Sequence, residues 1–136
     1  MRVNTGRFGE INIDNDKIIY FPEGVYGNHY LKKYFIVDYK EPIKWLHSIE
    51  SPSTAFIIVD PFKFFSAYSF VIEDDVERFL DIRSTKDVVV FVLLKLVDNK
   101  VVADLRYPIV INILNKKAKQ LVLGSEKYRF RPVASD

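Results

Sequence analysis

Short runs of β-branched and aromatic residues, separated by turn-forming residues, constrain the fold of this chain more than any other feature. The runs cover residues 34–37, 55–59, 88–97 and 109–111. Side chains of this kind favour strands, and the Asn, Asp, Gly, Pro and Ser residues between the runs favour turns. The pattern predicts a mainly β protein, a small antiparallel β-barrel or sandwich-like single domain over residues 1–136, with one or two short helices.

The longest apolar run predicts a hairpin. Residues 88–97 and 101–105 flank the pair Asp98-Asn99, and both residue types tolerate positive φ. The uninterrupted part, residues 88–94, predicts a strand that is buried on both faces or crosses a barrel interior. It is far shorter than the ~20 residues that span a bilayer.

One helix is expected at residues 75–80. Acidic residues 73–75 stand at its start, where the helix dipole favours them, and Val76, Phe79 and Leu80 form an apolar stripe at i, i+3 and i+4. A second short helical turn is expected near residues 28–33.

The residues that usually carry catalysis or bind metals are sparse. The chain has no cysteine, its net charge is +2, and its histidines, His29 and His47, have no second ligand at metal-binding spacing. His29 reads as a solvated loop residue and His47 as a strand residue beside Trp45, with a metal or catalytic role as the alternative. Scattered carboxylates leave a hydrolase as the competing hypothesis. The prediction is a protein without enzyme activity, cofactor or metal.

The N-terminal residues lack the apolar stretch and small-residue cleavage site of a signal peptide. Together with the absence of a membrane-length apolar run, this predicts a cytoplasmic location and no membrane partner.

Residues 60–70 are unusually aromatic, with five aromatic side chains among eleven positions. Pro61 ends the preceding strand. In an extended chain Phe62 and Phe64 would lie on one side and Phe65 on the other, while Ser66-Ala67 leaves the side of Tyr68 open. The block is either a corner that packs both ways or a partly exposed contact surface.

Aromatic and basic residues alternate near the C-terminus, at Tyr128, Arg129, Phe130 and Arg131. Such a pattern can stack bases and hold phosphates, so a direct single-strand RNA-binding module is an alternative function. An ordinary strand with arginine outward and aromatic inward gives the same pattern.

A series of short motifs in chain order resembles the FliW family. They are Phe8-Gly9-Glu10, Phe21-Pro22-Glu23-Gly24 with Gly27, Trp45-Leu46-x-Ser48, the block from Ala55 to Phe70, Pro108-Ile109-Val110-Ile111-Asn112, Gln120-x-x-Leu123 and Tyr128-x-x-Arg131. Compared with that family, Asn28 replaces an aromatic residue, Tyr107 replaces a small one, and no histidine separates Arg131 from Pro132.

The resemblance implies a partner switch. Proteins of the FliW family bind the filament protein flagellin and, alternatively, the translational regulator CsrA, whose repression of flagellin translation they relieve. Acidic residues at positions 10, 14 and 73–75 would complement the basic CsrA. The residues expected to bind partners are Phe62, Phe64, Phe65, Tyr68, Tyr128 and Arg131.

Overall fold

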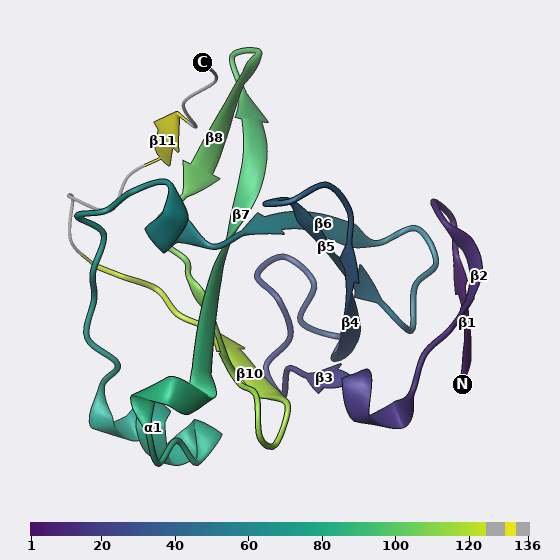
Figure 1. Ribbon diagram of the computed structural model, residues 1–136, viewed down its shortest axis with the longest axis horizontal. Coiled ribbons are helices and arrows are strands. Elements are labelled where there is room, and N and C mark those ends of the chain that lie inside the picture. Colours follow the sequence, from purple (N-terminus) through teal and green to yellow (C-terminus); the bar gives the residue numbers. More distant parts are fainter. Residues whose placement is uncertain (125–129, 133–136) are drawn as a thin grey trace.

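A seven-stranded barrel is the centre of the structure, a computed structural model that describes residues 1–124 and 130–132 (Figure 1). Around the barrel the strands follow the order β3 (Ile19–Tyr20), β4 (Lys33–Asp38), β5 (Lys44–Ser48), β6 (Ala55–Val59), β7 (Val88–Val97), β9 (Ile109–Asn112) and β10 (Lys117–Gln120). The β10–β3 contact that closes the barrel is parallel, and the other neighbours are antiparallel. The expected antiparallel β-barrel is confirmed.

Four further strands lie outside the barrel. β8 (Lys100–Asp104) pairs with the end of β7, and β11 (Phe130–Pro132) pairs with β8. β1 (Arg2–Thr5) and β2 (Gly9–Asn12) form a separate hairpin beside the barrel (Figure 1). The single-turn 3₁₀ helices are η1 (Asn15–Lys17), η2 (Pro61–Lys63) and η3 (Thr85–Asp87).

Local sequence signals predict the β7–β8 hairpin and the helix correctly. Asp98 and Asn99 have φ angles of 51° and 64°, as a two-residue hairpin turn requires. α1 (Asp74–Leu80) begins at the acidic residues and buries Val76 and Leu80. Its last turn ends at Asp81, which is left-handed with φ 55°.

The helical turn expected near residues 28–33 is wrong. The segment makes tight turns, in which the Leu31 amide donates to the Asn28 carbonyl (3.2 Å), and Lys33 already belongs to β4. The amides of Lys32 and Lys33 donate to Oε1 of Glu50, at 2.7 and 3.0 Å. A carboxylate from a distant turn therefore takes the donors that a helix would have used.

The antiparallel partner of β7 is interrupted by a bulge. Leu94 lies opposite Ala103, whereas Phe91 lies opposite Ile109, so three steps along β7 correspond to six steps along its partner. The extra residues lie between β8 and β9, and above them the β7–β8 hairpin projects out of the barrel (Figure 1). Bulges increase the local twist and bend of a strand pair, which accounts for the change of direction.

Hydrogen bonds from other parts of the chain hold the bulge in place. Its four carbonyls accept them as follows: Leu105 from the Tyr68 hydroxyl (2.8 Å), Arg106 from the Leu123 amide (2.8 Å), Tyr107 from Nε2 of Gln120 (3.1 Å) and Pro108 from the Leu121 amide (2.8 Å). The bulge is thus fixed by tertiary contacts and not by its own turn chemistry.

Asn112 ties α1 to the barrel. It is 2% exposed, and its Nδ2 donates to the carbonyls of Leu80 and Asp81 at 2.8 and 3.1 Å. Carbonyls at a helix C-terminus have no partner within the helix, so this amide satisfies two of them. The asparagine at the end of β9 therefore has a structural role.

Tyr34 is fully buried in the barrel, and its hydroxyl has no hydrogen-bond partner among the described residues. Burial, followed by the negative charge of Glu50, raises the pKa of Tyr34 to about 12. Because the folded state then holds the phenolic proton more tightly than the unfolded chain, the associated stability is present below pH ~10 and is lost as the pH rises toward 12.

Tyr34→Phe is therefore expected to leave the free energy of unfolding at neutral pH unchanged or raise it by up to about 1 kcal/mol, since it removes an unsatisfied buried group. Between pH ~9 and ~11 the variant should lose less stability than the wild type. Urea unfolding of both proteins across this range measures the difference. A loss of more than about 1 kcal/mol at neutral pH would show that the hydroxyl makes a stabilising bond.

Candidate protein-binding surface

The aromatic block, residues 61–70, is a corner and not an extended strand. Oδ1 of Asp60 accepts a hydrogen bond from the Phe62 amide (2.9 Å), and Pro61 occupies the first position of η2. A further turn follows, in which the Tyr68 amide donates to the Phe65 carbonyl (2.9 Å). The predicted alternation, with Phe62 and Phe64 opposite Phe65, is wrong because a capped proline starts a helical turn whose period is near three.

In the structure, the aromatic side chains of this block differ in how much of each is exposed to solvent. Phe62 is 46% exposed, whereas Phe64 and Phe65 are half-buried against the cluster that contains Val59. Tyr68 is 8% exposed, and its hydroxyl donates to the Leu105 carbonyl of the bulge. The block thus packs a corner and leaves one ring, Phe62, at the surface.

The projecting β7–β8 hairpin carries further exposed apolar side chains. Leu96 is 74% exposed and Val101 is 46% exposed, and the two lie opposite each other in the strand pair. They follow Leu94 and Ala103 on the same face of the hairpin, and those two residues pack in the same cluster as Phe64 and Phe65. η2 packs against β7 near the base of the hairpin (Figure 1). We call Phe62, Leu96 and Val101 the hairpin surface.

Sequence reasoning missed Leu96 and Val101. The available signal was length, because β7 has ten residues, more than a strand needs to cross a small barrel. Apolar side chains on the part of β7 beyond the barrel either pack in a second cluster, contact a partner or remain exposed to water.

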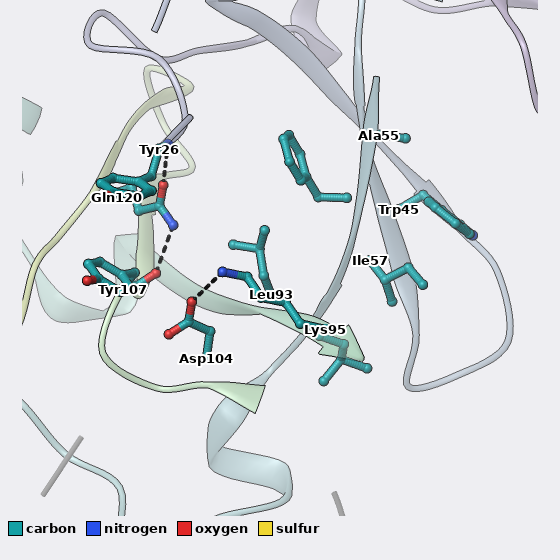
Figure 2. A pocket seen from close by; sticks show the side chains of 11 residues that line it. Tyr26, Trp45, Ala55, Ile57, Leu93, Lys95, Asp104, Tyr107 and Gln120 are labelled. Atoms are coloured by element: carbon teal, nitrogen blue, oxygen red, sulfur yellow. Dashed lines mark hydrogen bonds and ion pairs between the residues drawn. The ribbon is translucent and has the colours of Figure 1, made fainter. Parts of the chain in front are cut away.

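A cavity of about 370 Å³ opens where β6 and β7 part (Figure 2). These strands pair only at Ile58 with Leu93 and at Val59 with Val92. We call this space the fork cavity, and its lining residues are Tyr26, Trp45, Ala55, Phe56, Ile57, Leu93, Leu94, Lys95, Asp104, Tyr107 and Gln120. Its volume falls within the range of roughly 300–1,000 Å³ that is usual for ligand sites.

An ion pair lies in the fork cavity. Nζ of Lys95 is 2.8 Å from Oδ2 of Asp104 (Figure 2), and the aspartate side chain is 3% exposed while the lysine side chain is 43% exposed. A buried carboxylate therefore faces a cation that reaches solvent.

One wall of the cavity is aromatic and is connected by hydrogen bonds. The rings of Tyr26 and Tyr107 stack with centroids 5.3 Å apart. The Tyr26 amide donates to Oε1 of Gln120 (2.7 Å), and Nε2 of the same side chain donates to the Tyr107 carbonyl (3.1 Å), as Figure 2 shows. These residues come from different loops and strands, so no local motif could have indicated them.

The histidines lie as expected. His29 is exposed in a loop, and His47 is a buried residue of β5 whose ring stacks on Phe35 at 5.6 Å. Within residues 1–124 and 130–132, no group of three His, Asp or Glu residues is placed to hold a metal ion.

The acidic residues do not form one patch. Glu10 lies on the β1–β2 hairpin, where it faces Arg2 at 3.6 Å, whereas residues 73–75 lie at the start of α1. Figure 1 shows these elements on opposite sides of the molecule. Charge complementary to a basic partner, if these acids supply it, therefore comes from more than one surface.

The C-terminal pattern is described only in part. Residues 130–132 form β11, in which Arg131 lies opposite Ala103 of β8, so the expected strand is confirmed for these positions. Tyr128 and Arg129 lie outside the described residues. The alternative of single-strand RNA binding through residues 128–131 stays a prediction.

No helix in the described part of the chain is long and apolar enough to cross a membrane.

Comparisons with known proteins agree over nearly the whole chain. The family description "FliW protein" matches residues 2–133. The flagellar assembly factor FliW of Caldanaerobacter subterraneus is 34% identical over 94% of this chain and 89% of its own length. That of Alkaliphilus metalliredigens is 38% identical over 94% and 82%, and that of Ruminiclostridium cellulolyticum is 35% identical over 100% and 95%.

A solved structure agrees as well. A crystal structure of the flagellar assembly factor FliW superposes with a TM-score of 0.92 at 27% identity and covers 100% of this chain and 99% of its own. The matched relatives are named as assembly factors, and theirs is not a known enzyme family. The motifs, the barrel and these matches together show that the chain belongs to the FliW family of flagellar assembly factors.

Proposed function

We propose that this protein binds flagellin in the cytoplasm and, alternatively, the translational regulator CsrA, and that it thereby relieves CsrA repression of flagellin translation. Membership of the FliW family is the observation that carries this proposal. Such a function needs surfaces and not a nucleophile, a metal or a cofactor.

The hairpin surface supports the proposal physically. Phe62, Leu96 and Val101 are large apolar side chains at 46%, 74% and 46% exposure. The last two continue an apolar face that the aromatic block covers lower down. An amphipathic helix presents its apolar side chains at i, i+3, i+4 and i+7, and it binds where a partner offers exposed apolar anchors. We assign the flagellin contact to this surface, with Phe62 as its aromatic anchor.

Phe62→Ala is expected to leave the melting temperature nearly unchanged and to weaken flagellin binding by about 2 kcal/mol, roughly thirtyfold, as for an aromatic hot spot. The reason is that 46% of the Phe62 side chain is exposed in the isolated protein, and this part would become buried in the complex. Calorimetry with purified flagellin, beside a thermal melt of each variant, measures both quantities.

Leu114→Ala is the matched control. Leu114 is 71% exposed and lies in the β9–β10 turn, at the opposite end of the barrel from the hairpin (Figure 1). Its truncation should change neither stability nor binding. Equal flagellin affinity of Phe62→Ala and Leu114→Ala would remove the hairpin surface from the proposal.

A further inference from the structure

The fork cavity is lined by a buried carboxylate, Asp104, whose cationic partner reaches solvent. The Asp104 side chain is 3% exposed, and Lys95 contacts its Oδ2 atom. A buried carboxylate needs a cationic or hydrogen-bonding partner, and a cation that enters the cavity from outside can take the place of Lys95.

The surroundings of Asp104 suit the stem of a long basic side chain. Leu93 and Ile57 offer aliphatic contact, and the stacked rings of Tyr26 and Tyr107 offer an aromatic wall. Lysine and arginine bury their methylene stems along apolar surface, and their cationic heads are attracted to aromatic rings.

We propose that the fork cavity receives an arginine or lysine side chain from a protein partner, with its cationic head on Asp104. Lys95 is then an internal competitor for the same carboxylate. Its side chain is 43% exposed, so it can turn to solvent when the partner enters. Arginine fits better than lysine because its planar fork can contact both carboxylate oxygens at once.

The inference rests on the proposed function, because the contact between Asp104 and a basic side chain would form within the complex with CsrA that this function requires. Of the two proposed partners, an RNA-binding regulator has the more basic surface. The cavity is therefore assigned to CsrA, and the hairpin surface to flagellin.

Two variants of the ion pair test the proposal because they should act in opposite directions. Asp104→Asn removes the acceptor charge and should weaken CsrA binding about tenfold or more. Lys95→Met keeps the stem and removes the competitor, so it should bind CsrA as tightly as the wild type or several times more tightly, even where its melting temperature falls. A purely structural ion pair would weaken binding in both variants, and that result would overturn the proposal.

A small-molecule titration tests the cavity without any partner. Backbone amide NMR shifts of the wild-type protein would be followed as N-acetyl-arginine amide is added, with N-acetyl-citrulline amide as the uncharged control of the same shape. Saturable shifts at Ile57, Leu93 and Asp104 with arginine, and none with citrulline, are expected. The absence of shifts at millimolar arginine, or equal shifts with both compounds, would overturn the proposal.

These measurements also separate this inference from the proposed function. If the wild type binds neither CsrA nor flagellin, the proposed function fails, and the arginine titration still decides whether the cavity takes a basic side chain. If the wild type binds CsrA and Asp104→Asn binds it equally well, the inference fails alone.

Discussion

Replacing Tyr68 with alanine is expected to lower the free energy of unfolding by about 3–5 kcal/mol, the range for truncation of a buried aromatic side chain. The ring is 8% exposed and contacts Phe62 and Phe70, each at a centroid distance of 5.6 Å. Its hydroxyl also donates to the Leu105 carbonyl in the bulge (2.8 Å). Since small domains are stable by only ~5–15 kcal/mol, this loss is a large fraction of the total.

Tyr68→Phe separates packing from hydrogen bonding. It keeps the ring and removes the hydroxyl that holds the bulge, so a loss of about 1–2 kcal/mol is expected. Urea unfolding of wild type, Tyr68→Phe and Tyr68→Ala gives both contributions. A stable Tyr68→Ala protein that fails to bind flagellin would instead place Tyr68 in the binding surface, as the sequence analysis expects.

Replacing Gly24 with alanine is the second change with a large expected effect, about 2–5 kcal/mol of lost stability. Gly24 has φ +74°, and a Cβ there would stand 2.6 Å from the Cα of His29 and 2.7 Å from its carbonyl oxygen. Both neighbours are backbone atoms, so the loop would have to move. The substitution combines left-handed strain with a steric clash.

Gly27→Ala is the matched control because it has the strain without the clash. Gly27 has φ +89°, and a Cβ there would meet no atom within 4 Å. A loss of about 1–2 kcal/mol is expected from conformation alone. Thermal or urea unfolding of the two variants compares them directly, and equal losses would contradict the role assigned to the close approach at Gly24.

The loop that contains both glycines also positions the fork cavity, because Tyr26 lies between them and forms part of the cavity wall. Gly24→Ala should therefore disturb the Tyr26–Tyr107 stack as well as lower stability. The same loop therefore contributes both to the stability of the fold and to the cavity that is proposed to receive a basic side chain.

The sequence predicted those elements whose causes are local. β6 and β7 have the predicted bounds, since runs of β-branched residues end where proline or a turn-forming pair begins. α1 follows from its acidic start and its apolar stripe, and the hairpin turn follows from two residues that accept positive φ. In each case residues a few positions apart settle the conformation.

Predictions that needed partners from elsewhere in the chain were wrong or missing. The segment near residue 30 is not helical, because Glu50 takes its backbone donors. The aromatic block does not alternate, because Asp60 and Pro61 begin a turn that then packs beneath β7 and β8. Sequence reasoning treated both as isolated segments, whereas the folded protein supplies the competing contacts.

The sequence by itself determined the strands, the helix, the hairpin turn and, through its motifs, the resemblance to the FliW family. Only the tertiary structure decided which aromatic rings are exposed, and only it brought Lys95, Asp104, Tyr26 and Tyr107 around one cavity. The physical reason is distance along the chain: propensity and periodicity act over a few residues. By contrast, a bulge held by four distant donors and a fork between two strands exist only after the barrel has closed.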